Sequence, residues 1–269
     1  MKIVLFGSNG MLGSYIKAYL KNKWQVMPLT RADLDLSRSD KEEIFSFLNN
    51  NIDRGDIIIN AAGLINQRHP IVIDSVKVNS VFPQILADFK IKKDCEVLHI
   101  TTDCVFNGAG GSYIETDYHN CSDIYGITKS LGENCLNTNI RTSIIGEELN
   151  NKLSLLEWVL SMDGKVIDGY EDHVWNGVTC LELSKIISSI VENKKFWQGT
   201  RHIHSPNKVS KFDLINQIIE VYNLNIVVNK TKSKKSCYRD LHSNQPPIIE
   251  KDIRTQLVEM RQFNIKKRI

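Results

Sequence analysis

Residues 2–13 read KIVLFGSNGMLG, and they contain the pattern that decides the fold. The stretch opens with a short, continuous apolar run, which is typical of a strand buried in a parallel sheet. Gly7, Gly10 and Gly13 follow, and the helical periodicity of residues 11–22 starts among them. Glycines at such a turn let backbone N–H groups approach a pyrophosphate at the helix N-terminus. The stretch therefore predicts a dinucleotide-binding turn between a strand and a helix.

The spacing of these glycines leaves a simpler alternative open. It is GxxGxxG rather than GxGxxG, and glycines alone also form turns that bind nothing. Their position, directly after an apolar strand and at the start of a helix, favours the dinucleotide site.

Strand and helix patterns alternate from this turn onward. Further strands are expected at 24–30, 56–63, 96–103 and 139–146, and helices at 39–51 and 80–92. This alternation predicts an α/β fold with a Rossmann-type, doubly wound parallel sheet.

The second half of the chain is less regular. Helices are expected at 153–161, 180–194, 210–224 and 251–263, and strands at 199–206 and 225–230. We expect residues 1–150 to form the dinucleotide-binding domain, with a return near 172–200. Most of residues 151–269 should form a smaller α/β lobe that binds the substrate over the carboxyl ends of the sheet.

The composition excludes several classes of protein. The 34 basic and 31 acidic residues give a net charge of +3, which is too balanced to predict a nucleic-acid partner. No apolar stretch approaches the roughly 20 residues of a membrane helix, and the start does not resemble a signal peptide, so we expect a cytoplasmic protein. The six cysteines and seven histidines show no metal-ligand spacing, so we expect no metal site.

The end of the second strand indicates which dinucleotide binds. An acidic residue there would bind the ribose 2′-hydroxyl of NAD, but Thr30 and Arg31 occupy the place. Arginine suits a 2′-phosphate, so NADPH is the expected cofactor. NADH remains an alternative, because Asp33 or Asp35 lies close enough in sequence to accept it.

The cofactor site is expected to combine the glycine turn, the end of the second strand and the small residues NAAG at 60–63. The residues predicted to contact the cofactor are Gly7, Asn9, Gly10, Met11, Leu12, Gly13, Arg31, Asp35, Leu36, Ala61, Ala62 and Gly63, together with Tyr125 and Lys129.

A hydroxyl, a phenol and an amine follow in an order that suits carbonyl reduction. Thr102 ends the fourth strand, and Tyr125 and Lys129 lie four apart on the next helix, hence on one face. We expect Tyr125 to donate a proton to a carbonyl oxygen, with its pKa lowered by the charge of Lys129. Thr102 would stabilise the charge that develops on the same oxygen.

These motifs resemble the extended short-chain dehydrogenase/reductase family. The residues that carry the resemblance are GSNGMLG (7–13), NAAG (60–63), TTDCVFNG (101–108), DIYGITKSLGE (123–133) and RTSIIG (141–146). Within that family the chain is most similar to dTDP-4-dehydrorhamnose reductases and related nucleotide-sugar 4-ketoreductases. The resemblance implies a nucleoside-diphosphate 4-keto-6-deoxyhexose as substrate, Thr102, Tyr125 and Lys129 as the catalytic trio, and a homodimer as one assembly. It also implies that Val105, Phe106 and Asn107 line the sugar pocket.

Two stretches depart from the rhamnose-type pattern. Residues 64–75 read LINQRHPIVIDS, where the rhamnose-type reductases tend to carry an acidic run. Residues 141–149 and 175–183 resemble a subgroup that acts on UDP-linked sugars, including 2-acetamido-6-deoxyhexoses, and that sometimes epimerises C3 before reduction. The nucleoside and the epimerisation therefore stay open.

Three residues of the second half are further candidates for the substrate site. Trp175 and Asn176 lie in a loop expected to return to the sheet, where the indole would stack on the sugar or base or, alternatively, pack in the core. Arg239 offers a fork of donors that suits a diphosphate, although a surface ion pair is equally compatible.

Two other functions fit the same fold. An NAD-dependent epimerase or dehydratase would be expected to carry an acid after the second strand, where Arg31 lies instead. A non-enzymatic subunit that only senses the dinucleotide would be expected to lack the tyrosine or the lysine, and this chain has both.

Overall fold

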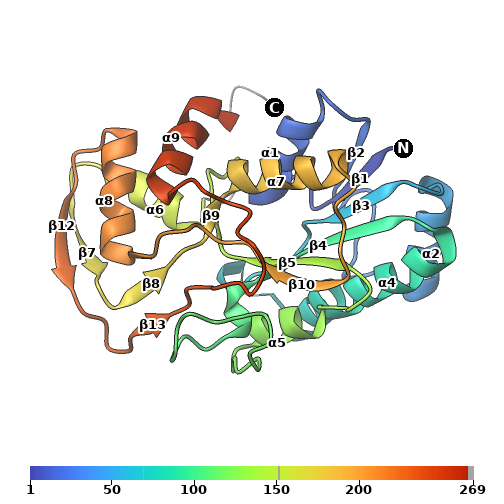
Figure 1. The fold of residues 1–269 in the computed structure, drawn as a ribbon, viewed down its shortest axis with the longest axis horizontal. Helices are drawn as coiled ribbons and strands as arrows, with labels where there is room; N and C mark the ends of the chain where they lie inside the picture. Colours follow the sequence, from blue (N-terminus) through green and yellow to red (C-terminus); the bar gives the residue numbers. More distant parts are fainter. Residues whose placement is uncertain (69, 151, 266–269) are drawn as a thin grey trace.

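A parallel sheet of six strands forms the centre of the molecule, seen in a computed structural model that describes residues 1–68, 70–150 and 152–265 (Figure 1). Its strands, in spatial order, are β10 (Gly199–His202), β5 (Thr138–Thr142), β4 (Glu96–Thr102), β3 (Ile57–Asn60), β1 (Ile3–Phe6) and β2 (Val26–Leu29). Strand β1 lies between β2 and β3, so the strand order reverses direction beside it. Ligands bind at such a reversal in doubly wound sheets. The predicted fold class is confirmed.

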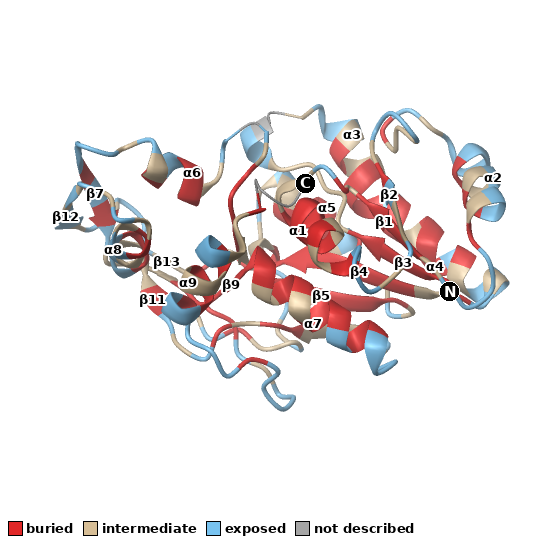
Figure 2. Cartoon of the chain, turned by 90° about the horizontal axis from the view of Figure 1, so that it is seen from above, coloured by how far each residue is buried: buried red, intermediate tan, exposed pale blue. Residues whose placement is uncertain are grey.

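Helices cover both faces of this sheet, which is why its inner strands are continuous apolar runs. One face packs against α1 (Met11–Leu20) and α7 (Cys180–Glu192), and Figure 1 shows both above the sheet. The other face packs against α2 (Lys41–Asn51) and α4 (Phe82–Lys93). Strands β1 and β3 are buried along their whole length, as the red strands of Figure 2 show.

The second half of the chain contributes to this sheet before it builds a lobe of its own. Helix α7 packs on α1, and β10 pairs in parallel with β5 at the edge of the sheet. The central sheet therefore joins segments that are far apart in the sequence, because β10 follows its partner β5 by more than fifty residues. The division at residue 150 stays a prediction.

Short strands and three helices form the lobe at the left of Figure 1. The strand pairs are β7 (Val166–Tyr170) with β12 (Val227–Thr231), and β8 (His173–Trp175) with both β11 (Val209–Ser210) and β13 (Cys237–Tyr238). The helices are α6 (Leu155–Leu160), α8 (Lys211–Tyr222) and α9 (Ile253–Phe263). Strands β6 (Ile144–Ile145) and β9 (Val178–Thr179) pair between sheet and lobe.

Local capping explains where several helices begin. Ser210 caps α8, since its hydroxyl accepts from the backbone N–H of Asp213. The Asp213 side chain in turn accepts from the backbone N–H of Ser210. Asp40 caps α2 in the same reciprocal way with Glu43. No helix among the described residues has the length and apolar character needed to span a membrane.

Candidate active site

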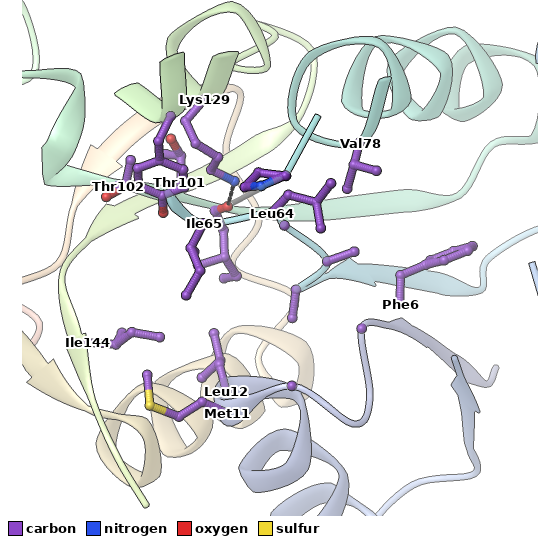
Figure 3. Close-up of a pocket in the computed structure, with 18 of the residues that line it drawn as sticks. Phe6, Met11, Leu12, Leu64, Ile65, Val78, Thr101, Thr102, Lys129 and Ile144 are labelled. Carbon is purple, nitrogen blue, oxygen red and sulfur yellow. Dashed lines mark hydrogen bonds between the residues drawn. The ribbon is translucent and has the colours of Figure 1, made fainter. Parts of the chain in front are cut away.

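A cleft of about 810 Å³ opens at the carboxyl ends of β1, β3 and β4 (Figure 3). Its wall is formed by the glycine turn, the ends of β2 and β3, and helix α5 (Ile124–Leu131). The apolar part of this wall includes Phe6, Leu12, Leu64, Ile65, Val78 and Ile144. An elongated cleft at the point where the strand order reverses is the expected place for a dinucleotide.

Close backbone contacts explain why the turn after β1 requires glycine. Gly7 has φ +75°, and a Cβ there would lie 2.7 Å from the backbone nitrogen of Ala62. A Cβ at Gly13 would lie 2.1 Å from the carbonyl oxygen of Gly7. Helix α1 therefore starts directly on the turn, with Gly10 as an N-cap that makes no side-chain hydrogen bond. Its N-terminal N–H groups point toward the cleft end of the strand, where they suit a phosphate.

The predicted cofactor residues divide into two groups in the structure. Most of them line the cleft: Gly7, Gly10, Met11, Leu12, Arg31, Asp35, Leu36, Ala61, Ala62, Gly63, Tyr125 and Lys129. Asn9 is exposed and Gly13 packs beneath the turn, and neither is among the lining residues.

Arg31 lies at the rim of the cleft. Its side chain is 64% exposed, and its guanidinium lies 3.7 Å from the Asp35 carboxylate. The Asp35 carboxylate in turn accepts from the Ser37 hydroxyl at 2.7 Å, and this loop bond, with the nearby arginine, keeps the Asp35 pKa low despite partial burial. An exposed cation therefore lies beside the end of β2, and both Arg31 and Asp35 line the cleft.

The loop after β3 is held by a buried amide. The Asn79 side chain accepts from the backbone N–H of Leu64 and donates to the Leu64 carbonyl, both at 2.9 Å. It also donates to the Thr128 hydroxyl on α5 at 3.1 Å. Asn79 lies in a π-helical segment, Val76–Val81, that leads into α4. One side chain thus joins the cofactor loop to the helix that carries Tyr125.

Thr102, Tyr125 and Lys129 meet on the wall of the cleft. Asp123 caps α5 by accepting from the backbone N–H of Gly126 at 3.0 Å, so the helix begins just before Tyr125. The Lys129 ammonium donates to the Ile100 carbonyl at 2.6 Å, which Figure 3 shows as a dashed line. The Thr102 hydroxyl lies close enough to the Tyr125 phenol to influence its pKa. The three predicted catalytic residues are therefore neighbours in the fold.

The electrostatics of this trio differ from the sequence-based expectation in one respect. Burial raises the pKa of Tyr125, and the nearby Cys104 and Asp103 raise it further, while Thr102 lowers it only partly. The predicted lowering of the Tyr125 pKa is therefore wrong for the protein alone, because desolvation is the largest effect. Burial also lowers the pKa of Lys129 to about 8, and the field of Glu133 opposes that shift.

Two of the residues that the resemblance placed in the sugar pocket lie in a closed cluster. Val105 and Phe106 have no exposed surface, and Phe106 stacks on Tyr113 with ring centroids 4.1 Å apart. The Asn107 side chain accepts from the backbone N–H of Ala109 at 2.9 Å. None of the three is among the residues that line the cleft. Val105 and Phe106 pack with Tyr113 and Leu241, and contact of the three residues with a substrate stays a prediction.

The candidates from the second half lie at the junction of lobe and sheet. Trp175 is buried, with the Lys211 ammonium 5.4 Å from its ring. The Asn176 amide bonds both backbone groups of Leu241, at 2.7 and 2.8 Å, which is a packing role. Arg239 donates to the Cys104 sulfur at 3.3 Å, and its buried Nε has no hydrogen-bond partner among the residues that the structure describes.

Sequence reasoning missed three groups beside the trio. Asp103 is buried and accepts from the Thr102 hydroxyl at 3.2 Å, and burial raises its pKa although Arg239 and Lys211 lower it. Cys104 also lines the cleft, and burial raises the pKa of its thiol to about 12. Lys211 had no signal in the sequence, because it reads as an ordinary first residue of a capped helix.

Comparison with known proteins agrees with this arrangement. The family model described as RmlD substrate binding domain matches residues 1–240. A dTDP-4-dehydrorhamnose reductase of Aggregatibacter actinomycetemcomitans is 30% identical over 227 residues, which cover 79% of this chain and 76% of that protein.

Two solved structures share the fold over nearly the whole chain. A dTDP-4-dehydrorhamnose reductase of Clostridium acetobutylicum superposes with a TM-score of 0.82 at 24% identity, covering 97% of this chain and 99% of that one. One from Bacillus anthracis, in complex with NADP, gives a TM-score of 0.83 at 18% identity, with the same coverage.

Proposed function

The chain belongs to the family of the RmlD substrate binding domain, and from that premise we propose that it is an NADPH-dependent nucleotide-sugar 4-ketoreductase. Its substrate is a nucleoside-diphosphate 4-keto-6-deoxyhexose of rhamnose type, used for surface glycans. The observation that carries the proposal is the meeting of Thr102, Tyr125 and Lys129 on one wall of the cleft that the glycine turn opens into.

The cofactor end of the cleft fits a dinucleotide. The turn at Gly7 has no room for a Cβ, and the N-terminus of α1 carries N–H groups without a side-chain cap. These groups would hold the pyrophosphate, and Arg31 at the rim would meet a 2′-phosphate. When bound, the reduced nicotinamide supplies the hydride that reaches C4 of the sugar.

The protein supplies the proton and the electrostatic stabilisation. Because burial raises its pKa, Tyr125 stays a neutral phenol at physiological pH and donates its proton to the C4 oxygen. Thr102 hydrogen-bonds the same oxygen while charge develops on it. The Lys129 ammonium, fixed on the Ile100 carbonyl, places a positive charge beside the phenolate that forms.

The substrate end of the cleft adjoins three groups of the lobe. Arg239 and Lys211 bring two cations close to Asp103 and Cys104 at the cleft wall, and the Nε of Arg239 is unpartnered within the described part of the chain. We infer that Arg239, with Lys211 beside it, binds the diphosphate, and that Trp175 supports this end through its contact with Lys211.

The nucleoside and any change at C3 are finer parts of the proposal. The named relative supports a dTDP-linked 4-keto sugar as the first substrate to test. A UDP-linked 2-acetamido sugar is the second, from the subgroup resemblance of residues 141–149 and 175–183. Epimerisation at C3 would have to use the same cleft.

The test is NADPH absorbance on mixing the purified protein with enzymatically prepared dTDP- and UDP-linked 4-keto-6-deoxyhexoses, with and without the 2-acetamido group. We expect oxidation with one of them, and rapid turnover identifies the substrate class. Binding of NADPH without oxidation in any mixture would contradict the reductase. Tightly bound NAD in the purified protein would favour an epimerase or dehydratase instead.

A further inference from the structure

Helix α5 is attached to the end of β4 by contacts that repeat every four residues. Tyr125 and Lys129 share a face of α5, and Glu133 follows at the same spacing just past the end of the helix. Lys129 donates to the Ile100 carbonyl at 2.6 Å, and Glu133 accepts from the Thr101 hydroxyl at 2.8 Å. Thr102, the next residue of the strand, lies close enough to the Tyr125 phenol to influence its pKa. Three consecutive residues of β4 thus lie beside Tyr125, Lys129 and Glu133.

Glu133 lies just past the end of α5. Its N–H donates to the Ser130 carbonyl at 3.2 Å. Only 7% of its side chain is exposed. A carboxylate so deeply buried requires strong partners, because removing it from water is costly.

Those partners come from two other strands of the sheet. The Arg141 guanidinium on β5 donates to both carboxylate oxygens, at 3.0 and 2.5 Å. The Thr200 hydroxyl on β10 donates to the same carboxylate at 3.2 Å. The Glu133 side chain therefore bonds to residues of β4, β5 and β10 at once. Neither Tyr125 nor Lys129 does so among the described residues.

We propose that Glu133 is a positioning residue: it fixes α5 against the end of β4 so that Tyr125 and Lys129 stay aligned with Thr102. The inference rests on the proposed reduction. Along α5 itself, the Lys129–Ile100 bond and the Asn79–Thr128 bond are each a single contact. The buried Glu133–Arg141 pair adds two hydrogen bonds that attach the segment just past α5 to β5, the strand next to β4.

The same carboxylate also acts on Lys129 electrostatically. Four titratable or charged groups interact with Glu133: Arg141 from β5, His119 from the loop before α5, His202 from β10, and Lys129. Glu133 raises the pKa of Lys129 against the effect of burial. Removing the carboxylate charge should therefore move the Lys129 titration to lower pH.

The decisive comparison is between Thr101→Val and Thr200→Val. Each removes one hydroxyl that donates to the Glu133 carboxylate, but only Thr101 lies on the strand that carries Thr102. Thr101→Val should lower kcat about tenfold with little change in the KM for NADPH, since misplacing a catalytic group by less than an ångström has effects of that order. Thr200→Val should keep wild-type kcat at a similar melting temperature. Equal kcat losses in the two variants, or no loss in either, would overturn the proposal.

A second variant, Glu133→Gln, separates the effect of the Glu133 charge on Lys129 from the positioning of α5. Glu133→Gln should move the alkaline limb of the kcat–pH profile to lower pH, whereas Thr101→Val should leave the limb in place. In the Glu133→Gln background, adding Thr101→Val should cause no further loss of kcat. If the kcat losses of the two single variants multiply in the double variant, Glu133 and Thr101 act independently, which would contradict the proposal.

A readout without turnover keeps this inference distinct from the proposed reduction. The Lys129 titration is followed by ¹³Cε NMR of labelled lysine, assigned with Lys129→Arg. If the wild type oxidises no NADPH with any sugar, the proposed function fails. The electrostatic half of the inference still stands if Glu133→Gln lowers the Lys129 pKa, and it fails if that pKa is unchanged.

Discussion

The two ends of the cleft are built in different ways. The cofactor end is made largely of backbone: the turn at Gly7, the N-terminus of α1 and the small residues after β3. The catalytic end is made of side chains that are buried and bonded to one another, with Lys129 on the Ile100 carbonyl and Glu133 on Thr101. The first end depends on a local sequence pattern, and the second depends on segments that meet only in the folded protein.

This difference determines how each end should respond to mutation. At the catalytic end, losing one polar atom should affect turnover and leave cofactor binding intact. At the cofactor end, adding one carbon should affect binding first. The following predictions test that separation, from the largest expected effect to the smallest.

Tyr125→Phe should have the largest effect. It removes the proton donor, so kcat should fall on the order of 10²-fold or more, while the Kd of NADPH stays nearly unchanged. Steady-state kinetics and a fluorescence titration measure the two quantities. Tyr113→Phe is the matched control, because that phenol lies in the closed cluster with Phe106. Turnover like that of the wild type in Tyr125→Phe would end the proposed role.

Gly7→Ala should act at the other end. The new Cβ would meet the Ala62 nitrogen at 2.7 Å, and φ +75° adds strain, so NADPH affinity should drop by about 10²-fold. Gly55→Ala is the control, since it has φ +80° and nothing within 4 Å of the added Cβ. If both variants bind NADPH equally well, close approach at Gly7 is not what the cofactor site requires.

Arg31→Ala should separate the two dinucleotides. Loss of a charged contact to the 2′-phosphate should weaken NADPH about tenfold and leave NADH affinity close to the wild-type value. Arg38→Ala, another exposed arginine of the same loop outside the cleft lining, should change neither affinity. Equal weakening of NADPH and NADH by Arg31→Ala would refute the assignment.

The pH dependence should show the smallest effect. Burial lowers the pKa of Lys129 to about 8, and the charged ammonium is the active form, so kcat/KM should be constant below that pH and fall as the pH rises through about 8. Tyr125 adds no limb in this range, because burial raises its pKa. A profile that stays flat to pH 9.5 would exclude Lys129 as the group that titrates.

Much of the fold was predictable because its signals are local. The apolar runs of β1 and β3 and the cap at Ser210 each depend on a few neighbouring residues. The pairing of β10 with β5 was not predictable, because it joins residues about sixty apart with no pattern to mark the partner. The order of the sheet strands follows from tertiary packing in the same way.

The residues of the candidate site also differ in how local their sequence signals are. The trio was predictable from a hydroxyl and a YxxxK spacing. The direction of the Tyr125 pKa was predicted wrongly, because desolvation is a property of the whole fold and outweighs one nearby charge. Lys211 and Glu133 were missed as well, since nothing in the sequence pairs them with their partners, Trp175 on β8 and Arg141 on β5.

The central claim is a direct hydride transfer to C4 of a nucleotide-linked keto sugar, and NADPH deuterated at the transferable C4 position tests it most directly. After incubation with the sugar that supports oxidation, we predict a product one mass unit heavier than the product formed with unlabelled NADPH. NMR should place the deuterium at C4 of the sugar. An unlabelled product, formed while NADPH stays reduced, would contradict the account and indicate a bound dinucleotide that is recycled.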